Sequence, residues 1–149
     1  MEDPVNVPAM VTGARRPRVL VVDDDRAVRE VMSLILMSLD AEVQAVSDAA
    51  QALGLLERQA FDILFVDFHM PVISGLELSS MVRRRRPAVP IVLVTGDPPA
   101  PTAAERAGIT RILSKPFALR EVMTCLTDAL HAAEPPRAGC YVSEERCPN

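Results

Sequence analysis

VLVVDDD, residues 19–25, joins four consecutive aliphatic side chains to three aspartates. Two later stretches have the same form: ILFVD at residues 63–67 and IVLVTG at residues 91–96. Continuous apolar runs of this length are typical of strands that are covered on both faces, as in a parallel sheet. The three runs therefore predict the central strands of such a sheet.

Helical patterns separate these runs. Two weaker strand candidates, residues 42–46 and 111–114, complete a regular alternation of strand and helix. The alternation occurs five times, which predicts an α/β domain with a parallel sheet, helices on both faces and right-handed crossovers. Two predicted helices carry one apolar stripe each, made by Val28, Val31, Met32, Ile35, Leu36 and Leu39, and by Leu119, Val122, Met123, Leu126, Leu130 and Ala133.

Polar residues mark the predicted helix starts. Ser74–Glu77 (SGLE) and Thr102–Glu105 (TAAE) both fit a capping box, in which a hydroxyl and a carboxylate satisfy free amides reciprocally. Ser47 is predicted to cap a helix over residues 48–59. Three prolines within residues 98–101 remove amide donors, so we expect the fourth helix to start no earlier than about Thr102 and to be short.

The composition fits one globular domain. The chain has 149 residues, of which 49% are hydrophobic and 24% charged. We predict a folded domain over residues 18–133, a flexible leader over residues 1–17 and a disordered tail over residues 134–149, because both ends are rich in proline and polar residues. Aromatic residues are only 3% of the chain, so the core must be aliphatic.

Charge and cysteine content restrict the partners and the location. The net charge of -4 argues against binding to nucleic acid or to an anionic membrane. No apolar run approaches the roughly 20 residues that a membrane span needs. Cys125, Cys140 and Cys147 lack the spacing of a zinc site, and acidic residues replace the basic start of a signal peptide. We therefore expect a cytoplasmic protein.

The polar residues that follow the strands predict a site. Asp23–Asp25, Asp67, Thr95 and Lys115 each follow a predicted strand, and the carboxyl ends of parallel strands share one rim. Carboxylates crowded at one edge repel each other unless a cation intervenes, and Mg²⁺ is the simplest such cation. Carboxylates with a metal, a hydroxyl and an amine indicate a site for a phosphoryl group.

Four motifs resemble the landmarks of the receiver domain of bacterial two-component response regulators. They occur in the family's order over residues 18–133, and this resemblance implies a flavodoxin-like (βα)5 fold with strand order 2-1-3-4-5. The motifs are Val21–Asp25, Asp67–Pro71 together with Gly75, Val94–Gly96 and Lys115–Phe117.

The resemblance implies a role for each rim residue. Asp67 would accept a phosphoryl group from a phosphohistidine of a histidine kinase or phosphotransfer protein. Asp23 and Asp24 would organise Mg²⁺, together with Asp67 and the backbone carbonyl of His69. Thr95 and Lys115 would contact the phosphoryl oxygens. The family also implies a cis peptide between Lys115 and Pro116.

One position departs from the usual family pattern, and two others stand where the family varies the lifetime of the phosphoryl group. Ile112 occupies the position where many receivers carry a tyrosine or phenylalanine that rotates on activation, so we expect switching without an aromatic flip. His69 and Asp97, each two residues after a rim residue, stand where the family tunes loss of the phosphoryl group to water.

The sequence thus predicts a signalling switch with at most slow self-dephosphorylation and no other enzymatic activity. We expect a stand-alone receiver that acts on an unidentified protein target, as a monomer or a phosphorylation-linked homodimer. The alternative is a haloacid dehalogenase-like phosphohydrolase with Asp23 as nucleophile, because Asp23 and Asp25 fit that class's D-x-D motif. Thr95 and Lys115 could imitate that class's second and third motifs, but Ala27 occupies the usual Thr or Val position and no later acidic pair supplies the final metal motif.

Overall fold

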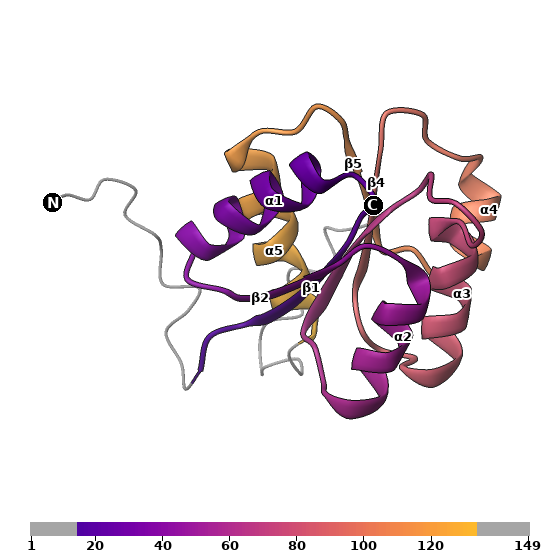
Figure 1. Cartoon of the computed structure of the whole chain (residues 1–149), viewed down its shortest axis with the longest axis horizontal. Helices are drawn as coiled ribbons and strands as arrows, with labels where there is room; N and C mark the ends of the chain where they lie inside the picture. Colours follow the sequence, from indigo (N-terminus) through magenta and orange to yellow (C-terminus); the bar gives the residue numbers. More distant parts are fainter. Residues whose placement is uncertain (1–14, 134–149) are drawn as a thin grey trace, which may run out of the picture.

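The computed structural model, which describes residues 15–133, contains a five-stranded sheet with helices packed against it (Figure 1). All four strand pairings are parallel, and the strand order is β2-β1-β3-β4-β5, as predicted. The strands are β1 (Arg18–Val22), β2 (Glu42–Val46), β3 (Ile63–Asp67), β4 (Ile91–Thr95) and β5 (Arg111–Ser114). The helices are α1 (Arg26–Ser38), α2 (Ala49–Arg58), α3 (Gly75–Arg85), α4 (Pro101–Arg106) and α5 (Leu119–Ala133).

The central strands are buried along their whole length. Every residue of β3 and β4 is buried, and so are Val19–Val22 of β1. The edge strands β2 and β5 are more exposed, which explains why their sequences carry a weaker apolar signal. The continuous runs therefore identified the strands that are covered on both faces.

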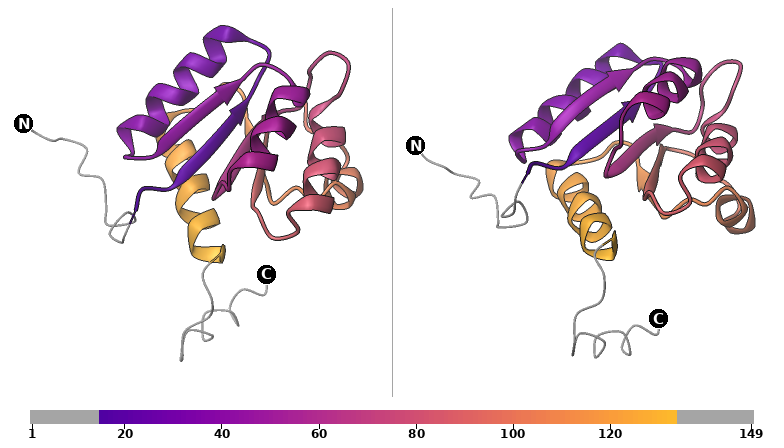
Figure 2. Two further views of the ribbon diagram at one scale, coloured as in Figure 1. Left: turned by 60° about the horizontal axis from the view of Figure 1, so that its bottom comes forward. Right: turned by 90° about the horizontal axis from the view of Figure 1, so that it is seen from below.

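The two faces of the sheet have separate apolar cores. One core includes Leu36 of α1 and Leu126 of α5, together with the strand residues on that face. The other includes Leu56 of α2 and Leu78 of α3. Figure 2 shows α1 and α5 on one side of the sheet and α2 and α3 on the other. This arrangement leaves the two ends of the strands as the places where loops gather.

The N-cap of α3 is the residue that the sequence predicted, whereas the N-cap of α2 is its neighbour. The capping box at Ser74 is confirmed, because Ser74 Oγ accepts the Glu77 amide at 3.2 Å and the Glu77 carboxylate accepts the Ser74 amide at 2.9 Å. The prediction for Ser47 is wrong: Asp48 caps α2 by accepting the Gln51 amide at 2.8 Å. Asp48 lies one residue closer to the helix, and its side chain accepts the free amide there.

The fourth helix is short, as predicted, but the predicted capping box at Thr102 is wrong. α4 has six residues and begins at Pro101, one residue earlier than expected. Its N-cap is Ala100, which makes no side-chain hydrogen bond. Pro101 fits the first helical position because it needs no amide partner there, and it places Thr102 inside the first turn.

Within the described residues, Arg15 and Pro17 of the predicted leader contact the domain. The Arg15 guanidinium lies 2.9 Å from the Asp62 carboxylate, and the Pro17 carbonyl accepts the Glu42 amide at 2.8 Å. The predicted tail, most of the predicted leader, and Cys140 and Cys147 lie outside the described residues. Among residues 15–133, no helix is long and apolar enough to cross a membrane.

Candidate functional site

Three carboxylates meet where the strands end. Asp67 is the last residue of β3, and Asp23 and Asp24 directly follow β1. One oxygen from each of the three lies within 4.8 Å of the others. Asp23 and Asp67 are buried, whereas Asp24 is exposed and leaves the cluster open to solvent. The structure thus brings together the three aspartates that the sequence placed at one rim.

Hydrogen bonds fix the turn that carries Asp23. Its Oδ1 accepts the Asp25 amide at 2.8 Å, and its backbone carbonyl accepts a hydrogen bond from Arg29 Nη1 at 2.9 Å. The Asp25 carboxylate turns away to cap α1, where it accepts the Ala27 amide at 2.9 Å. Asp25 is therefore the N-cap of α1, and its carboxylate is not part of the cluster. Sequence reasoning missed Arg29, because its contact runs back along the chain by six residues to a backbone atom.

Lys115 places its ammonium between two of the carboxylates. Lys115 Nζ lies 3.0 Å from Asp67 Oδ1 and 3.6 Å from Asp23 Oδ2. The Lys115 amide donates to the Thr95 carbonyl at 3.0 Å, which ties the end of β5 to the end of β4. The Lys115–Pro116 peptide is cis, as the resemblance implied. Lys115 is also the only lysine of the whole chain.

Burial governs the protonation of this cluster. Burial is the main reason that the pKa of Asp23 is raised to about 6; the hydrogen bond from the Asp25 amide opposes the shift, and the charge of Asp67 adds to it. Burial is likewise the main reason that the pKa of Asp67 is raised, against the opposing hydrogen bond from Lys115. Burial acts to lower the pKa of Lys115, but the hydrogen bond to Asp67 and the charge of Asp23 outweigh it, and the net shift is upward. The site favours bound positive charge.

The donor set fits Mg²⁺. The three clustered side chains offer carboxylate oxygens, which are the hard ligands that Mg²⁺ prefers, and the exposed position of Asp24 leaves the cluster accessible from solvent. The backbone carbonyl of His69 as a further ligand stays a prediction.

Thr95 supplies a hydroxyl beside the carboxylates. It ends β4 and is buried, and the β3–β4 register pairs Asp67 with the residue before it, Val94. Thr95 Oγ1 accepts the Asp97 amide at 3.0 Å. A hydroxyl that accepts a hydrogen bond still has its own hydrogen to donate, so Thr95 can offer a donor to an anion at the rim.

Gly75 permits a close approach at the base of the site. A Cβ at this position would lie 2.3 Å from the Asp67 carbonyl oxygen. The Gly75 amide donates to the Phe68 carbonyl at 2.8 Å, which folds the intervening loop back on itself. In that loop Val72 has φ +70° and is 98% exposed, an unfavourable conformation for a β-branched residue. The sequence identified Gly75 only through the resemblance, and no local pattern marks Val72.

His69 and Asp97 face each other at the opening. His69 Nε2 lies 3.9 Å from Asp97 Oδ2, and both side chains are exposed. The His69 ring stacks on Phe68, with a centroid separation of 4.3 Å. The two residues follow Asp67 and Thr95 by two positions each, so they lie in the loops that leave β3 and β4.

Ile112 lies away from the carboxylates, in the middle of edge strand β5. It is half-buried and pairs with Leu93 of β4. Leu113, its neighbour, belongs to the core on the α1 and α5 face, so alternation turns Ile112 to the opposite face. The side chain that the resemblance marks as a switch is therefore aliphatic and on the side of the sheet where α3 packs.

Comparison with known proteins identifies relatives over the same residues. Residues 19–127 match the family model of the response regulator receiver domain. The response regulator protein FleR of Pseudomonas aeruginosa is 38% identical over 108 residues, which are 71% of this chain and 23% of FleR. The response regulator MprA of Mycobacterium leprae is 34% identical over 123 residues, which are 79% of this chain and 53% of MprA. The chain therefore spans about a quarter of FleR and about half of MprA.

Solved structures agree with this match. The chemotaxis response regulator CheY4 of Vibrio cholerae has a TM-score of 0.72 and 28% identity, and the match covers 77% of this chain and 99% of CheY4. The signal receiver domain of an HD domain-containing protein from Pseudomonas fluorescens Pf-5 has a TM-score of 0.75 and 30% identity, with 80% and 98% covered. These matches cover nearly all of the compared structures.

Proposed function

The chain belongs to the response regulator receiver domain family, and on this premise we propose that Asp67 accepts a phosphoryl group from the phosphohistidine of a histidine kinase or phosphotransfer protein. The observation that carries the proposal is the contact of 3.0 Å between Lys115 Nζ and Asp67 Oδ1, beside the carboxylates of Asp23 and Asp24. A buried carboxylate held at a strand end by an ammonium is an acceptor whose position is fixed before the donor arrives.

The transfer moves one phosphoryl group between two nucleophiles. An Asp67 carboxylate oxygen forms a bond to phosphorus while the bond from phosphorus to the donor's imidazole nitrogen breaks, and that nitrogen keeps the electron pair. Such transfers need little covalent work from the protein, so position and charge stabilisation carry the catalysis. Lys115 neutralises the equatorial oxygens, and Thr95 donates its hydroxyl hydrogen to one of them.

Asp23, Asp24 and Asp67 would hold Mg²⁺, which supplies charge neutralisation for the carboxylates and the phosphoryl oxygens when it is bound. The exposed carboxylate of Asp24 keeps one side of the cluster accessible to the donor. Arg29, by holding the Asp23 carbonyl at 2.9 Å, keeps the turn in the conformation that directs Asp23 inward.

The phosphorylated state would differ from the free state through Thr95. In the free state Thr95 Oγ1 accepts the Asp97 amide, which begins the loop to α4. When the hydroxyl turns to the phosphoryl group, this loop shifts and α4 moves with it. Ile112 implies that no aromatic rotation accompanies the change. The phosphoryl group biases an existing equilibrium by the contacts that it makes in one state only.

The described domain would act as a switch through protein contacts. The part of the chain that the structure describes consists of the receiver fold, so we place the output on its surface, in a monomer or a phosphorylation-linked homodimer. We propose a cytoplasmic location and at most slow loss of the phosphoryl group to water, at a rate set by His69 and Asp97 at the opening.

Phosphoramidate, which carries a phosphorus–nitrogen bond, is the donor for the test. With Mg²⁺ present, the full chain should form an acid-stable, base-labile acyl phosphate, and Asp67→Asn should form none. Asp48→Asn is the matched control, because Asn preserves the cap of α2 outside the cluster and labelling should persist. Equal labelling of wild type and Asp67→Asn contradicts the proposal.

The phosphohydrolase alternative predicts another result. It requires steady turnover of a phosphate ester such as p-nitrophenyl phosphate and loss of that turnover in Asp23→Asn. The Asp25 carboxylate, the second acid of that class's motif, caps α1 and so gives the alternative no support.

A further inference from the structure

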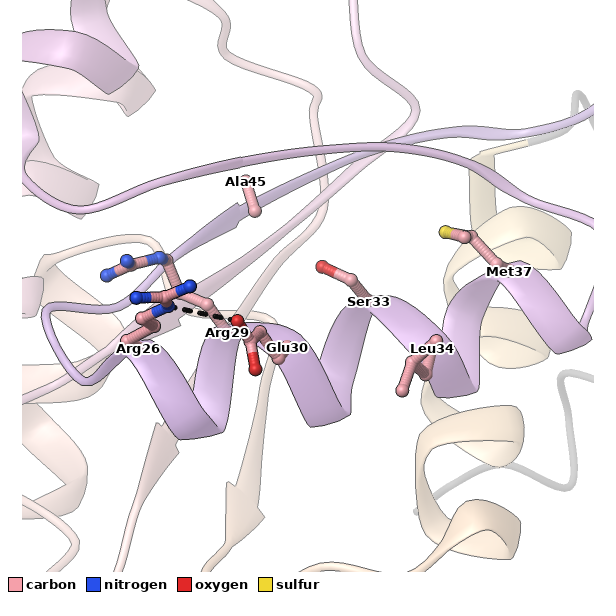
Figure 3. Close-up of a pocket in the computed structure, with 7 residues that line it drawn as sticks. All are labelled: Arg26, Arg29, Glu30, Ser33, Leu34, Met37 and Ala45. Carbon is pink, nitrogen blue, oxygen red and sulfur yellow. Dashed lines mark hydrogen bonds and ion pairs between the residues drawn. The ribbon is translucent and has the colours of Figure 1, made fainter.

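An open groove runs along α1 beside the edge strand β2, and one of the residues that line it, Arg29, also contacts the Asp23 backbone (Figure 3). Its volume is about 390 Å³. Leu34 and Met37, on its apolar half, are 64% and 54% exposed, so two large apolar side chains one turn apart lie at the surface of α1. The groove is lined by Arg26, Arg29, Glu30, Ser33, Leu34, Met37 and Ala45.

The strand beside this groove has a free hydrogen-bonding edge. The Glu42 amide donates to the Pro17 carbonyl at 2.8 Å, and the Val46 carbonyl accepts the Asp23 amide at 3.1 Å, so the even-numbered residues of β2 face β1. Alternate residues of a strand direct their amides and carbonyls to opposite sides. Val43 and Ala45 therefore direct theirs outward, where no strand pairs with them within residues 15–133.

Val43 and Ala45, whose amides and carbonyls point away from β1, have their side chains on the face of the sheet that carries the groove. Ala45 lines the groove, and Val43 packs against the core that contains α1. On an added strand, side chains directly opposite Val43 and Ala45 would lie on this same face. An added strand would therefore bury every second side chain in the groove while its backbone fills the open edge.

The chain before Arg15 contains a segment of matching pattern. Val5, Val7, Ala9 and Val11 occupy alternate positions, which is the period of a strand with one apolar face. Pro4 and Pro8 fall at the other positions. There the missing amide would point to solvent, the only orientation that an edge strand tolerates for proline.

The charges of the groove favour an acidic segment: Arg26 Nε pairs with Glu30 at 3.0 Å, and Arg29 leaves this end of the groove with a net positive charge. Residues 1–14 contain Glu2 and Asp3 and no lysine, arginine or histidine. Arg26 and Arg29 stand at the start of α1, at one end of the groove, while Leu34 and Met37 stand toward the other end (Figure 3). A chain with acidic residues first and valines after them has the same order as the groove.

The point of entry and the length fit this path. Arg16 Nε lies 3.8 Å from Asp40 Oδ1 in the turn after α1, so the chain arrives beside the Met37 end of the groove. The groove follows α1 from Met37 back to Arg26, which is about 17 Å of helix. Residues 2–14 reach about 40 Å when extended, which leaves slack for the turn at the entry.

We propose that residues 5–11 bind the outer edge of β2 as an antiparallel strand, with Val5, Val7 and Val11 in the groove and Glu2 and Asp3 beside Arg26 and Arg29. We call this segment the N-terminal strap. It covers the sheet edge against pairing with other chains, and its test does not require phosphorylation of Asp67.

Hydrogen exchange in the full chain tests the strap. The Val43 and Ala45 amides should be protected in the wild type, and Val7→Pro should speed their exchange about tenfold or more because the inward-facing amide of residue 7 is lost. Asn6→Pro is the matched control: its amide faces solvent in the strap, so protection should persist. The amides of β3 report that each variant is folded.

Three outcomes would overturn the proposal. Val43 and Ala45 could exchange in the wild type as fast as unstructured amides, or the two proline variants could have equal effects. Protection that grows with protein concentration would instead assign the edge to a second copy of the chain.

Discussion

Lys115 and Asp67, 48 positions apart in the sequence, lie in direct contact, with Lys115 Nζ 3.0 Å from Asp67 Oδ1. The contact joins the end of β5 to the end of β3 across the intervening β4. It sets the charge of the site before any ligand binds, because the ammonium offsets the cost of burying Asp67.

The single lysine makes this contact measurable. Reductive methylation with ¹³C-formaldehyde labels Lys115 and the N-terminal amine only, and the dimethylated amine keeps its charge. Because Asp67 raises the pKa of Lys115, the labelled amine should titrate at lower pH in Asp67→Asn than in the wild type, as followed by NMR. Asp48→Asn should leave the titration unchanged. An identical titration in wild type and Asp67→Asn would show that the pair is not formed in solution.

Asp23 should destabilise the metal-free domain at neutral pH. Its folded pKa of about 6 lies above the ordinary value of 3.8, so between these two pH values the folded state keeps a proton that the unfolded state has released. Stability from this group is highest below pH 4, falls between pH 4 and 6, and stays low above. Without Mg²⁺, Asp23→Asn should raise the free energy of unfolding at pH 7 by roughly 2 kcal/mol, because the upward shift of the pKa, which already includes the attraction to Lys115, measures the cost of the buried charge.

Urea unfolding at pH 7 and pH 3.5, in the presence of EDTA, measures this effect. The difference between variant and wild type should vanish at pH 3.5. Millimolar Mg²⁺ should stabilise the wild type more than the variant, since binding to the folded state adds to its stability. An Asp23→Asn variant less stable than wild type at pH 7 in EDTA contradicts the assignment of burial as the dominant cause.

Gly75→Ala should distort the site from below. The added Cβ would lie 2.3 Å from the Asp67 carbonyl oxygen, so the backbone of Asp67 must move. We expect a loss of about 2 to 3 kcal/mol in the free energy of unfolding and slower labelling by phosphoramidate. Gly54→Ala is the control, and its expected effect on the free energy of unfolding has the opposite sign. Its nearest new neighbour is 3.9 Å away within α2, and alanine should stabilise the helix by about 0.5 to 1 kcal/mol.

α4 should exchange its amides faster than α3. It has six residues, no side-chain cap and one buried side chain, Ala104. Arg83 of α3 anchors its far end, with Nη2 donating to the Gly108 carbonyl at 2.6 Å. Arg83→Met should speed exchange in α4 about fivefold, the effect of losing roughly 1 kcal/mol. Arg84→Met, on the exposed side of α3, should change little, and equal effects of the two variants would remove Arg83 from this role.

Local patterns predicted much of the fold because burial leaves a direct trace in the sequence. β3 and β4 are buried at every residue, so each appears as an unbroken apolar run. The capping box at Ser74 was also predictable, since it depends on residues three positions apart. Where two polar residues adjoin, as at Ser47 and Asp48, the pattern does not decide which one caps the helix. At α4 the preference of Pro101 for the first helical position overrides the threonine behind it.

The site was predictable to the extent that it depends on strand ends. Asp23, Asp67, Thr95 and Lys115 follow strands, and topology alone brings them to one rim. Contacts through space leave no such trace. Arg29 reaches a carbonyl, and Gly75 is needed because the Asp67 backbone passes within reach of a Cβ. These requirements depend on where the loops pass, which the sequence pattern does not specify.

Mapping the phosphorylated residue tests the central claim most directly. The chain is incubated with phosphoramidate and Mg²⁺, the acyl phosphate is reduced with borohydride, and tandem mass spectrometry locates the homoserine that results. We predict homoserine at Asp67, no product without Mg²⁺, and no product at Asp23 or Asp24. Homoserine at Asp23, or at no aspartate of the cluster, would contradict the account.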